Sequence, residues 1–276
     1  ALTRLLPGNA TITGSVRLSG ESLLDLAPSG LRDVRGRDIA YVFQEPMTSL
    51  NPVLTVGRQI GEVLRRHQHM RGAAVSQRAA ELLDLVGIPL PRRRLREYPH
   101  QLSGGMRQRV MIAMAVACRP KLLIADEPTT ALDVTVQAGI LDVLRDLRAE
   151  TGTAVLLITH DLGVVADLAD RVVVMYAGRT IEEAGTEALF AHHSHPYTRG
   201  LLGAVPNPQR RTDGGLREIP GRVPTMRNSP ESCTFAARCE YVDDLCRHER
   251  PSLQNGPAGH PVRCFHPLPV DVEVAR

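Results

Sequence analysis

Two adjacent carboxylates, Asp126 and Glu127, follow an apolar run of strand length at residues 122–125. In parallel α/β sheets, ligands bind at the carboxyl ends of strands, which is where these acids would emerge. Asp126 is predicted to hold Mg²⁺, because this ion takes a few carboxylates and keeps much of its own water. Glu127 would orient or deprotonate a water that attacks a phosphate. The alternative is a strand that simply ends in two solvated acids. The Asp-Glu pair alone does not decide between a catalytic and a solvated strand end.

A glycine turn precedes the acids, in the order Leu-Ser-Gly-Gly-Met-Arg-Gln-Arg at residues 102–109. Gly104 and Gly105 let the backbone approach an anion closely, and Ser103 adds a hydroxyl. The following apolar run reads as a helix, whose N-terminal N–H groups would bind a phosphate. A capped helix after a turn explains Ser-Gly-Gly equally well, but it does not explain the order of all eight residues.

Two further polar residues follow predicted strands. His160 comes after residues 154–158, so its imidazole would emerge beside the acids and donate to a γ-phosphate. Gln44 follows residues 38–43 and could reach the metal or the attacking water. Taken alone, a His or a Gln at the end of a strand is more often structural. The hypothesis that these residues act on a phosphate therefore depends on their order along the chain.

These side chains require a sheet whose strands end at one edge. Four apolar segments read as strands: residues 38–43, 121–125, 154–158 and 171–176. Apolar residues at helical spacing predict helices at 76–86 and 134–148, with Gly87 after the first. The alternation predicts an α/β fold with a parallel sheet covered by helices. Beyond about residue 189 the pattern becomes irregular.

Composition excludes several functions. With 43% hydrophobic and 23% charged residues, the 276-residue chain is expected to be globular. A net charge of +3 is too balanced for a nucleic-acid groove, and 3% aromatics without Trp argue against base stacking. The longest apolar run, residues 110–118, is shorter than the ~20 residues that a membrane helix needs.

Taken in order, the motifs resemble the nucleotide-binding subunit of ATP-binding-cassette (ABC) transporters. The family's Q-loop, signature motif, Walker B strand with catalytic glutamate, D-loop and switch histidine match Gln44, residues 102–109, Asp126–Glu127, Asp133 and His160. The resemblance implies a P-loop NTPase (RecA-like) core with an inserted helical subdomain, in a dimer that sandwiches two ATP molecules. On that model the signature residues serve the partner's ATP: Ser103, Gly104, Gly105 and Gln108. The chain's own ATP would be served by Asp126, Glu127, His160 and Gln44. Of these, Asp126 and Gln44 would bind the Mg²⁺.

Flanking segments resemble the dipeptide, oligopeptide and nickel importers: residues 44–52, 98–101, 195–199 and 219–224. This implies an ATPase that energises import at the cytoplasmic face of the cell membrane. Its partners would be a second ABC ATPase subunit, identical or not, two permease subunits and, indirectly, an extracellular substrate-binding protein. Residues 46–52 and the helices after them are expected to dock on the permease. The cargo is not set by this chain.

The phosphate loop that the family requires, Gly-x-x-x-x-Gly-Lys-Ser/Thr, has no match. Lys121 is the only lysine and precedes the acidic strand. The family pattern places this loop before Ala1, so two accounts are open: a fragment that lacks its N-terminal part, or a natural remnant. Either account predicts that the chain as printed does not hydrolyse ATP alone.

Four of the five cysteines lie near the C-terminus: Cys233, Cys239, Cys246 and Cys264. Structural zinc sites pair cysteines two to four residues apart, which fits these spacings poorly. Four thiolates on an irregular segment suit a [4Fe–4S] cluster, and the importer subfamily often carries such a tail. Reduced buried thiols and zinc remain alternatives.

The chain is predicted to have four parts: residues 1–45 and 119–190 in the ATPase core, 46–118 as the helical subdomain, and 191–276 as a Cys-rich extension. Two other functions remain. One is a non-transport ABC ATPase acting on DNA or ribosomes, although residues 44–103 hold neither a long coiled coil nor a second cassette. The other is a non-enzymatic regulatory or assembly subunit.

Overall fold

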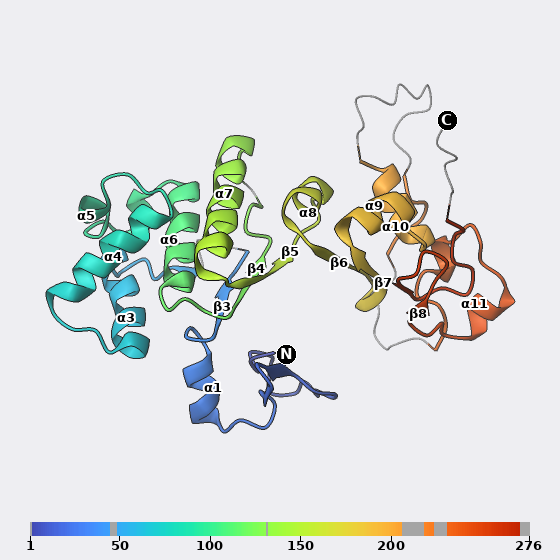
Figure 1. The fold of residues 1–276 in the computed structure, drawn as a ribbon, viewed down its shortest axis with the longest axis horizontal. Coiled ribbons are helices and arrows are strands. Elements are labelled where there is room, and N and C mark those ends of the chain that lie inside the picture. The colour runs from blue at the N-terminus through green and yellow to red at the C-terminus, as the bar shows by residue number, and fades with distance from the viewer. Residues whose placement is uncertain (1, 45–48, 131, 206–217, 224–230, 271–276) are drawn as a thin grey trace. The chain divides into compact units, whose positions relative to one another are not determined.

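The computed structural model describes residues 2–44, 49–130, 132–205, 218–223 and 231–270. Two compact units divide the chain, Ala1–His160 and Asp161–Arg276. Because these units are larger than the four parts expected from the sequence, the finer division stays a prediction. Figure 1 shows the elements of both units.

The first unit is built around a parallel sheet. Its elements are β1 (Arg17–Leu18), β2 (Glu21–Ser22), α1 (Pro28–Val34), β3 (Ile39–Val42), α3 (Val56–Gln68), α4 (Ala73–Leu85), α5 (Pro91–Arg94), η1 (Pro99–Gln101), α6 (Gly104–Val116), β4 (Leu122–Asp126), α7 (Val134–Thr151) and β5 (Ala154–Ile158). The strands β3, β4 and β5 pair in that order and all run parallel. This confirms the expected parallel sheet for three of the four predicted strands.

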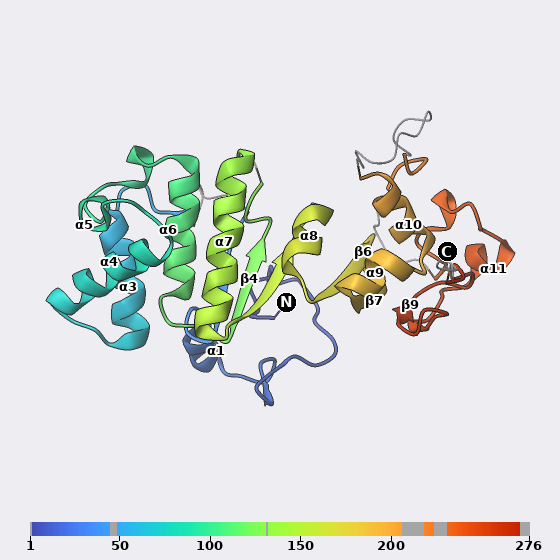
Figure 2. The same cartoon turned by 45° about the horizontal axis from the view of Figure 1, so that its top comes forward.

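Helices pack beside this sheet. In both views α6 and α7 lie side by side along β4, and α3, α4 and α5 gather beyond α6 (Figure 2). The helix α7 begins at Asp133, whose side chain caps Val136 N, and ends at Gly152 in the left-handed region. Its buried face includes Ile140 and Leu144. The helical layer therefore supports the strand edge that carries the acids.

One face of β5 differs from expectation. Residues 154–158 form a strand with the predicted bounds. However, Leu156 is 44% exposed and Ile158 46% exposed, so helices do not cover this strand as the alternation predicted for the sheet. Among the described residues, little covers these two side chains.

The second unit contains α8 (Leu162–Leu168), β6 (Arg171–Tyr176), β7 (Arg179–Gly185), α9 (Thr186–His192), α10 (Pro196–Gly203), η2 (Ala236–Arg238), α11 (Asp244–His248), β8 (Gln254–Asn255) and β9 (Pro261–Val262). Its sheet is antiparallel, in the order β6, β7, β9, β8. Residues 171–176 form the predicted strand but do not join the parallel sheet. Ala177 and Gly178 both have positive φ, and this two-residue turn pairs β6 with β7 as a hairpin.

Candidate active site

Three strands bring polar residues to one edge of the parallel sheet. Val42 of β3 is paired with Ala125 of β4, and Asp126 of β4 with Ile158 of β5, so the carboxyl ends of the strands coincide. Gln44, Glu127 and His160 follow these ends within two residues. The structure thus brings together three residues that the sequence analysis selected separately.

Glu127 is the centre of this group. Its Oε2 accepts hydrogen bonds from Gln44 Nε2 at 2.7 Å and from Thr130 Oγ1 at 2.8 Å. Its Oε1 lies 3.1 Å from His160 Nδ1. Both carboxylate oxygens are therefore engaged by side chains from different segments of the chain.

These contacts set the charge of the site. Hydrogen bonds from Thr130, then from His160, with a smaller one from Gln44, hold the pKa of Glu127 below its ordinary value. The side chain of Glu127 is 25% exposed, and that of His160 is 76% exposed. At neutral pH the edge therefore presents an ionised carboxylate and an imidazole to solvent.

The backbone of Glu127 is unusual. Its φ is +45°, a left-handed conformation that is costly for a residue with a side chain. Two hydrogen bonds hold it: Glu127 N donates to Ile158 O at 2.8 Å, and Thr130 N donates to Glu127 O at 3.2 Å. At this turn the chain leaves the strand direction of β4, and the Thr130 hydroxyl comes within 2.8 Å of the Glu127 carboxylate. Sequence reasoning missed Thr130, although it lies only three residues after Glu127 in the chain.

The other two predicted acids are positioned differently. Asp126 is the last residue of β4 and is half-buried at the same edge. Asp133 caps α7, and its Oδ1 accepts from Val136 N at 2.9 Å. Its carboxylate therefore has a structural task at the start of that helix. Ala131, also in the predicted D-loop, lies outside the described residues.

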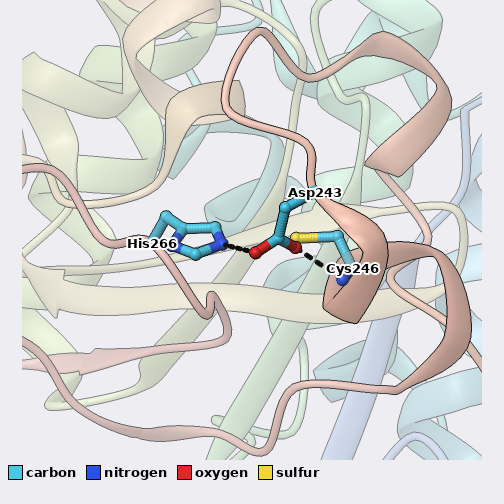
Figure 3. A group of neighbouring side chains, drawn as sticks. All are labelled: Asp243, Cys246 and His266. Atoms are coloured by element: carbon cyan, nitrogen blue, oxygen red, sulfur yellow. Dashed lines mark hydrogen bonds and ion pairs between the residues drawn. The ribbon is translucent and has the colours of Figure 1, made fainter.

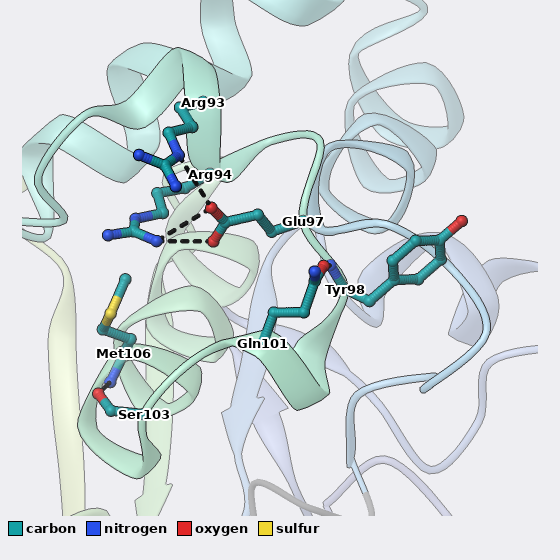
Figure 4. Close-up of polar contacts among 7 residues, drawn as sticks. All are labelled: Arg93, Arg94, Glu97, Tyr98, Gln101, Ser103 and Met106. Carbon is teal, nitrogen blue, oxygen red and sulfur yellow. Dashed lines mark hydrogen bonds and ion pairs between the residues drawn. The ribbon is translucent and has the colours of Figure 1, made fainter.

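The signature turn begins α6 (Figure 4). Ser103 is the N-cap, and its Oγ accepts from Met106 N at 3.3 Å. A Cβ on Gly105 would overlap Val136 of α7, whereas one on Gly104 would meet only Leu132, at 3.9 Å. Gly105 thus allows two helices to pack closely, whereas Gly104 has space for a side chain.

Gln108 lies on α6 and is 1% exposed. Among the residues that the structure describes, its Nε2 has no hydrogen-bond partner. Its expected contact with ATP held by a partner subunit stays a prediction.

The four C-terminal cysteines gather in the second unit. None of them is in a disulfide. Burial raises the pKa of all four thiols, to about 12 at Cys264, where the sulfurs of Cys233, Cys239 and Cys246 also act. Cys233 and Cys239 pack on an apolar cluster that includes Phe235. Cys233 N donates to Cys246 O at 3.0 Å, so these two cysteines lie on neighbouring segments.

A second group shares one of these cysteines (Figure 3). Asp243, Cys246 and His266 have potential ligand atoms within 4.8 Å of one another. Asp243 Oδ1 accepts from Cys246 N at 2.9 Å, and Asp243 Oδ2 lies 2.8 Å from His266 Nε2. The sequence analysis named only the cysteine of this group.

Sequence reasoning also missed a buried carboxylate in the second unit. Glu182 of β7 is 0% exposed and accepts from Ser194 N and from His195 N, the latter at 3.1 Å. His260 Nε2 lies 2.8 Å from the same carboxylate. His195 caps α10 by accepting from Tyr197 N, and burial lowers its pKa to about 4. Glu182 therefore connects residues 194–195 and His260 to β7 through its carboxylate. No local sequence pattern predicts these contacts.

None of the helices that the structure describes is long and apolar enough to cross a membrane.

Comparison with known proteins shows the family to which the chain belongs. Residues 1–130 match the family model for ABC transporters, and residues 181–246 match that for the oligopeptide/dipeptide transporter C-terminal region. The chain is similar to the solved dimer of the ATP-binding cassette MJ0796 in a post-hydrolysis state with ADP and Pi. The TM-score is 0.57 at 32% identity, over 63% of this chain and 74% of that one. The fold is therefore that of an ATP-binding cassette.

Curated relatives narrow the family. A probable peptide ABC transporter ATP-binding protein, y4tR of Sinorhizobium fredii, is 52% identical over 96% of this chain and 80% of its own length. The oligopeptide transport ATP-binding protein AppD of Bacillus subtilis is 50% identical over 94% of this chain and 78% of its own length. The chain belongs to the family of ATP-hydrolysing subunits of peptide ABC transporters.

Proposed function

We propose that this chain energises the import of dipeptides or oligopeptides by hydrolysing ATP at the cytoplasmic face of the membrane. The observation that carries the proposal is the convergence of Gln44, Thr130 and His160 on the Glu127 carboxylate at the strand edge. Peptides are favoured over nickel because both the family model for residues 181–246 and the named relatives concern peptide transport.

Glu127 would act as the general base. Its lowered pKa keeps the carboxylate ionised, so it can accept a proton from the attacking water. Among the described residues, Oε1 has only the contact with His160, so it keeps a lone pair that can accept from that water. His160, which is largely exposed, would then donate to the γ-phosphate.

The donor set at this edge fits Mg²⁺. Asp126 supplies a carboxylate, and Gln44 supplies an amide oxygen, since its Nε2 already donates to Glu127. When bound, Mg²⁺ would offset charge on the phosphates. The turn at Ser103 and Gly104 would bind ATP held by a second cassette subunit, identical or related. The dimeric state of the MJ0796 cassette supports this arrangement.

ATP turnover tests the proposal. The printed 276 residues contain no phosphate-loop motif, so we expect no Mg²⁺-dependent phosphate release from this chain alone. A version extended at its N-terminus to include such a loop should hydrolyse ATP. Turnover by the printed chain would contradict the first expectation. An extended version that binds no nucleotide would favour a non-enzymatic subunit.

Co-purification tests the transport role. We expect the extended chain to be recovered with two membrane permease subunits and a second ATPase subunit. Recovery with ribosomes or DNA instead would favour a non-transport ABC ATPase. The cargo itself would be identified with the extracellular binding protein.

We also propose that Cys233, Cys239, Cys246 and Cys264 hold a [4Fe–4S] cluster. Four free thiols, half-buried or buried in the second unit, match the number of ligands that such a cluster takes. The competing group, Asp243 and His266 with Cys246, would instead suit zinc. Anaerobic protein should contain iron and acid-labile sulfide, and His266→Ala should keep both. One zinc per chain, lost in His266→Ala, would overturn the cluster.

A further inference from the structure

A cleft of about 710 Å³ opens in the helical part of the first unit, beside α3, α4 and α5. This volume lies within the range of pockets that hold small molecules. Four of its lining residues are arginines: Arg58, Arg65, Arg92 and Arg96. Among the described residues that line the cleft there is no Asp or Glu. The cleft is therefore strongly cationic.

The charge of these arginines is not balanced within the part of the chain that the structure describes. None of the four forms an ion pair there, and Arg92 Nη2 donates to the side-chain oxygen of Gln77, at 3.0 Å. The neighbouring Arg93 and Arg94, by contrast, both pair with Glu97 (Figure 4). Because like charges that face one cleft repel each other, an anion bound between them would relieve that repulsion.

The spacing of the arginines favours a long ligand over a compact one. Arg58 and Arg65 both lie on α3, and the seven residues between their positions correspond to two helical turns, or ~10 Å along the axis. Arg92 lies on α5, and Arg96 follows that helix by two residues. A chain of linked anionic groups can therefore contact arginines from both segments at once, which a single anionic group does less well.

Backbone hydrogen bonds hold two walls of the cleft together. Gly57 N donates to Leu95 O at 2.9 Å, and a Cβ on Gly57 would lie 2.8 Å from that oxygen. Val56 N donates to Glu97 O at 2.9 Å. The start of α3 is thus fixed against residues 95–97. A ligand would meet a preformed site, which lowers the entropy cost of binding.

We infer that this cleft binds a small soluble anion with several linked phosphate groups, either a free polyphosphate or the phosphate tail of a nucleotide. Guanidinium groups bind phosphate oxygens through two parallel hydrogen bonds. Thr55 and Ser76, which also line the cleft, add hydroxyl groups that can donate to phosphate oxygens. The cleft shares no lining residue with the strand edge around Glu127, so this is a second anion site on the chain.

Calorimetric titration of the printed chain with sodium tripolyphosphate tests the site. Tripolyphosphate should bind at least roughly tenfold more tightly than inorganic phosphate, and added salt should weaken its binding. The double variant Arg58→Gln/Arg96→Gln should lose roughly tenfold or more of this affinity. Arg71→Gln, which changes an exposed arginine outside the cleft, is the matched control and should keep wild-type affinity.

Thermal unfolding gives a second readout. Tripolyphosphate should raise the unfolding temperature of the wild type and of Arg71→Gln, because it binds only the folded chain, and should not raise that of the double variant. Should the double variant fold poorly, the single change Arg65→Gln gives the same comparison with a smaller loss. Displacement of tripolyphosphate by ATP would identify the nucleotide tail as the ligand, and its persistence would identify free polyphosphate.

Three results would overturn the inference. The first is equal tripolyphosphate affinity in the wild type and a folded double variant, or no binding by the wild type at low salt. The second is a tetra-aspartate peptide that binds more tightly than tripolyphosphate, which would assign the cleft to carboxylates. The third is arginine-dependent binding to phosphatidylglycerol vesicles without tripolyphosphate binding, which would assign it to a membrane surface. These titrations need neither turnover nor transport, so their outcome is independent of the proposed function.

Discussion

Glu127 Oε1 and His160 Nδ1 lie 3.1 Å apart although 33 residues separate them in the chain. They meet because β4 and β5 are parallel neighbours, with Asp126 opposite Ile158. The left-handed turn at Glu127 then directs its carboxylate toward both His160 and Gln44. The carboxylate that we propose as the general base and the imidazole that we propose as the proton donor are thereby held at one edge of the sheet.

Replacing Thr130 by Val should weaken hydrolysis in the extended chain. Thr130 makes the largest contribution to the lowered pKa of Glu127, so its loss should raise that pKa toward the ordinary value. We expect turnover to fall roughly tenfold and the acid limb of its pH profile to move to higher pH. Steady-state rates measured across pH would show both effects.

Thr130→Ser is the control, because it keeps the hydroxyl. It should restore the wild-type profile. An identical pH profile for the Val and wild-type proteins would mean that Thr130 does not position the base.

The two signature glycines should differ in stability. Gly105→Ala should lower the free energy of unfolding by about 1–3 kcal/mol, because its Cβ overlaps Val136 of α7. Gly104→Ala should be much milder, since its nearest neighbour would be 3.9 Å away. Urea unfolding of the printed chain measures both variants. Equal losses would contradict the packing argument.

Buried His195 should make the second unit sensitive to acid. Burial lowers its pKa to about 4 in the folded state, against attraction from Glu182 and a hydrogen bond to Arg263 that both act to raise it. The unfolded chain, with its ordinary value of 6.5, therefore takes up a proton first as pH falls. The contribution of His195 to the free energy of unfolding is fully present above pH 6.5. It is lost as the pH falls toward 4, by at most about 3 kcal/mol.

His195→Asn tests this dependence. Asn can still accept from the backbone as a helix cap but does not titrate in this range. The free energy of unfolding of the variant should therefore change less between pH 7 and pH 4.5 than that of the wild type. Parallel curves for the two proteins would exclude His195 as the source.

The sequence predicted which edge of the sheet carries Glu127 and His160, because the carboxyl ends of neighbouring parallel strands lie at the same edge. Once residues 122–125 and 154–158 are read as neighbouring strands, Glu127 and His160 must lie close. It did not predict Glu182, because the partners of that carboxylate come from distant segments. It also missed Thr130, whose contact with Glu127 is local but follows no hydrophobic period. The strand at 171–176 had the right bounds, but it pairs with β7 in an antiparallel sheet rather than with the parallel one.

Single-turnover ATP hydrolysis by Glu127→Gln in the extended chain tests the central claim most directly. Glu81→Gln is the matched control, because Glu81 also accepts from a glutamine side chain, at 3.1 Å, but lies on α4. We predict that Glu127→Gln keeps ATP binding and loses hydrolysis by roughly a hundredfold or more. The control should keep both. Hydrolysis at the wild-type rate in Glu127→Gln, with ATP bound, would contradict the account.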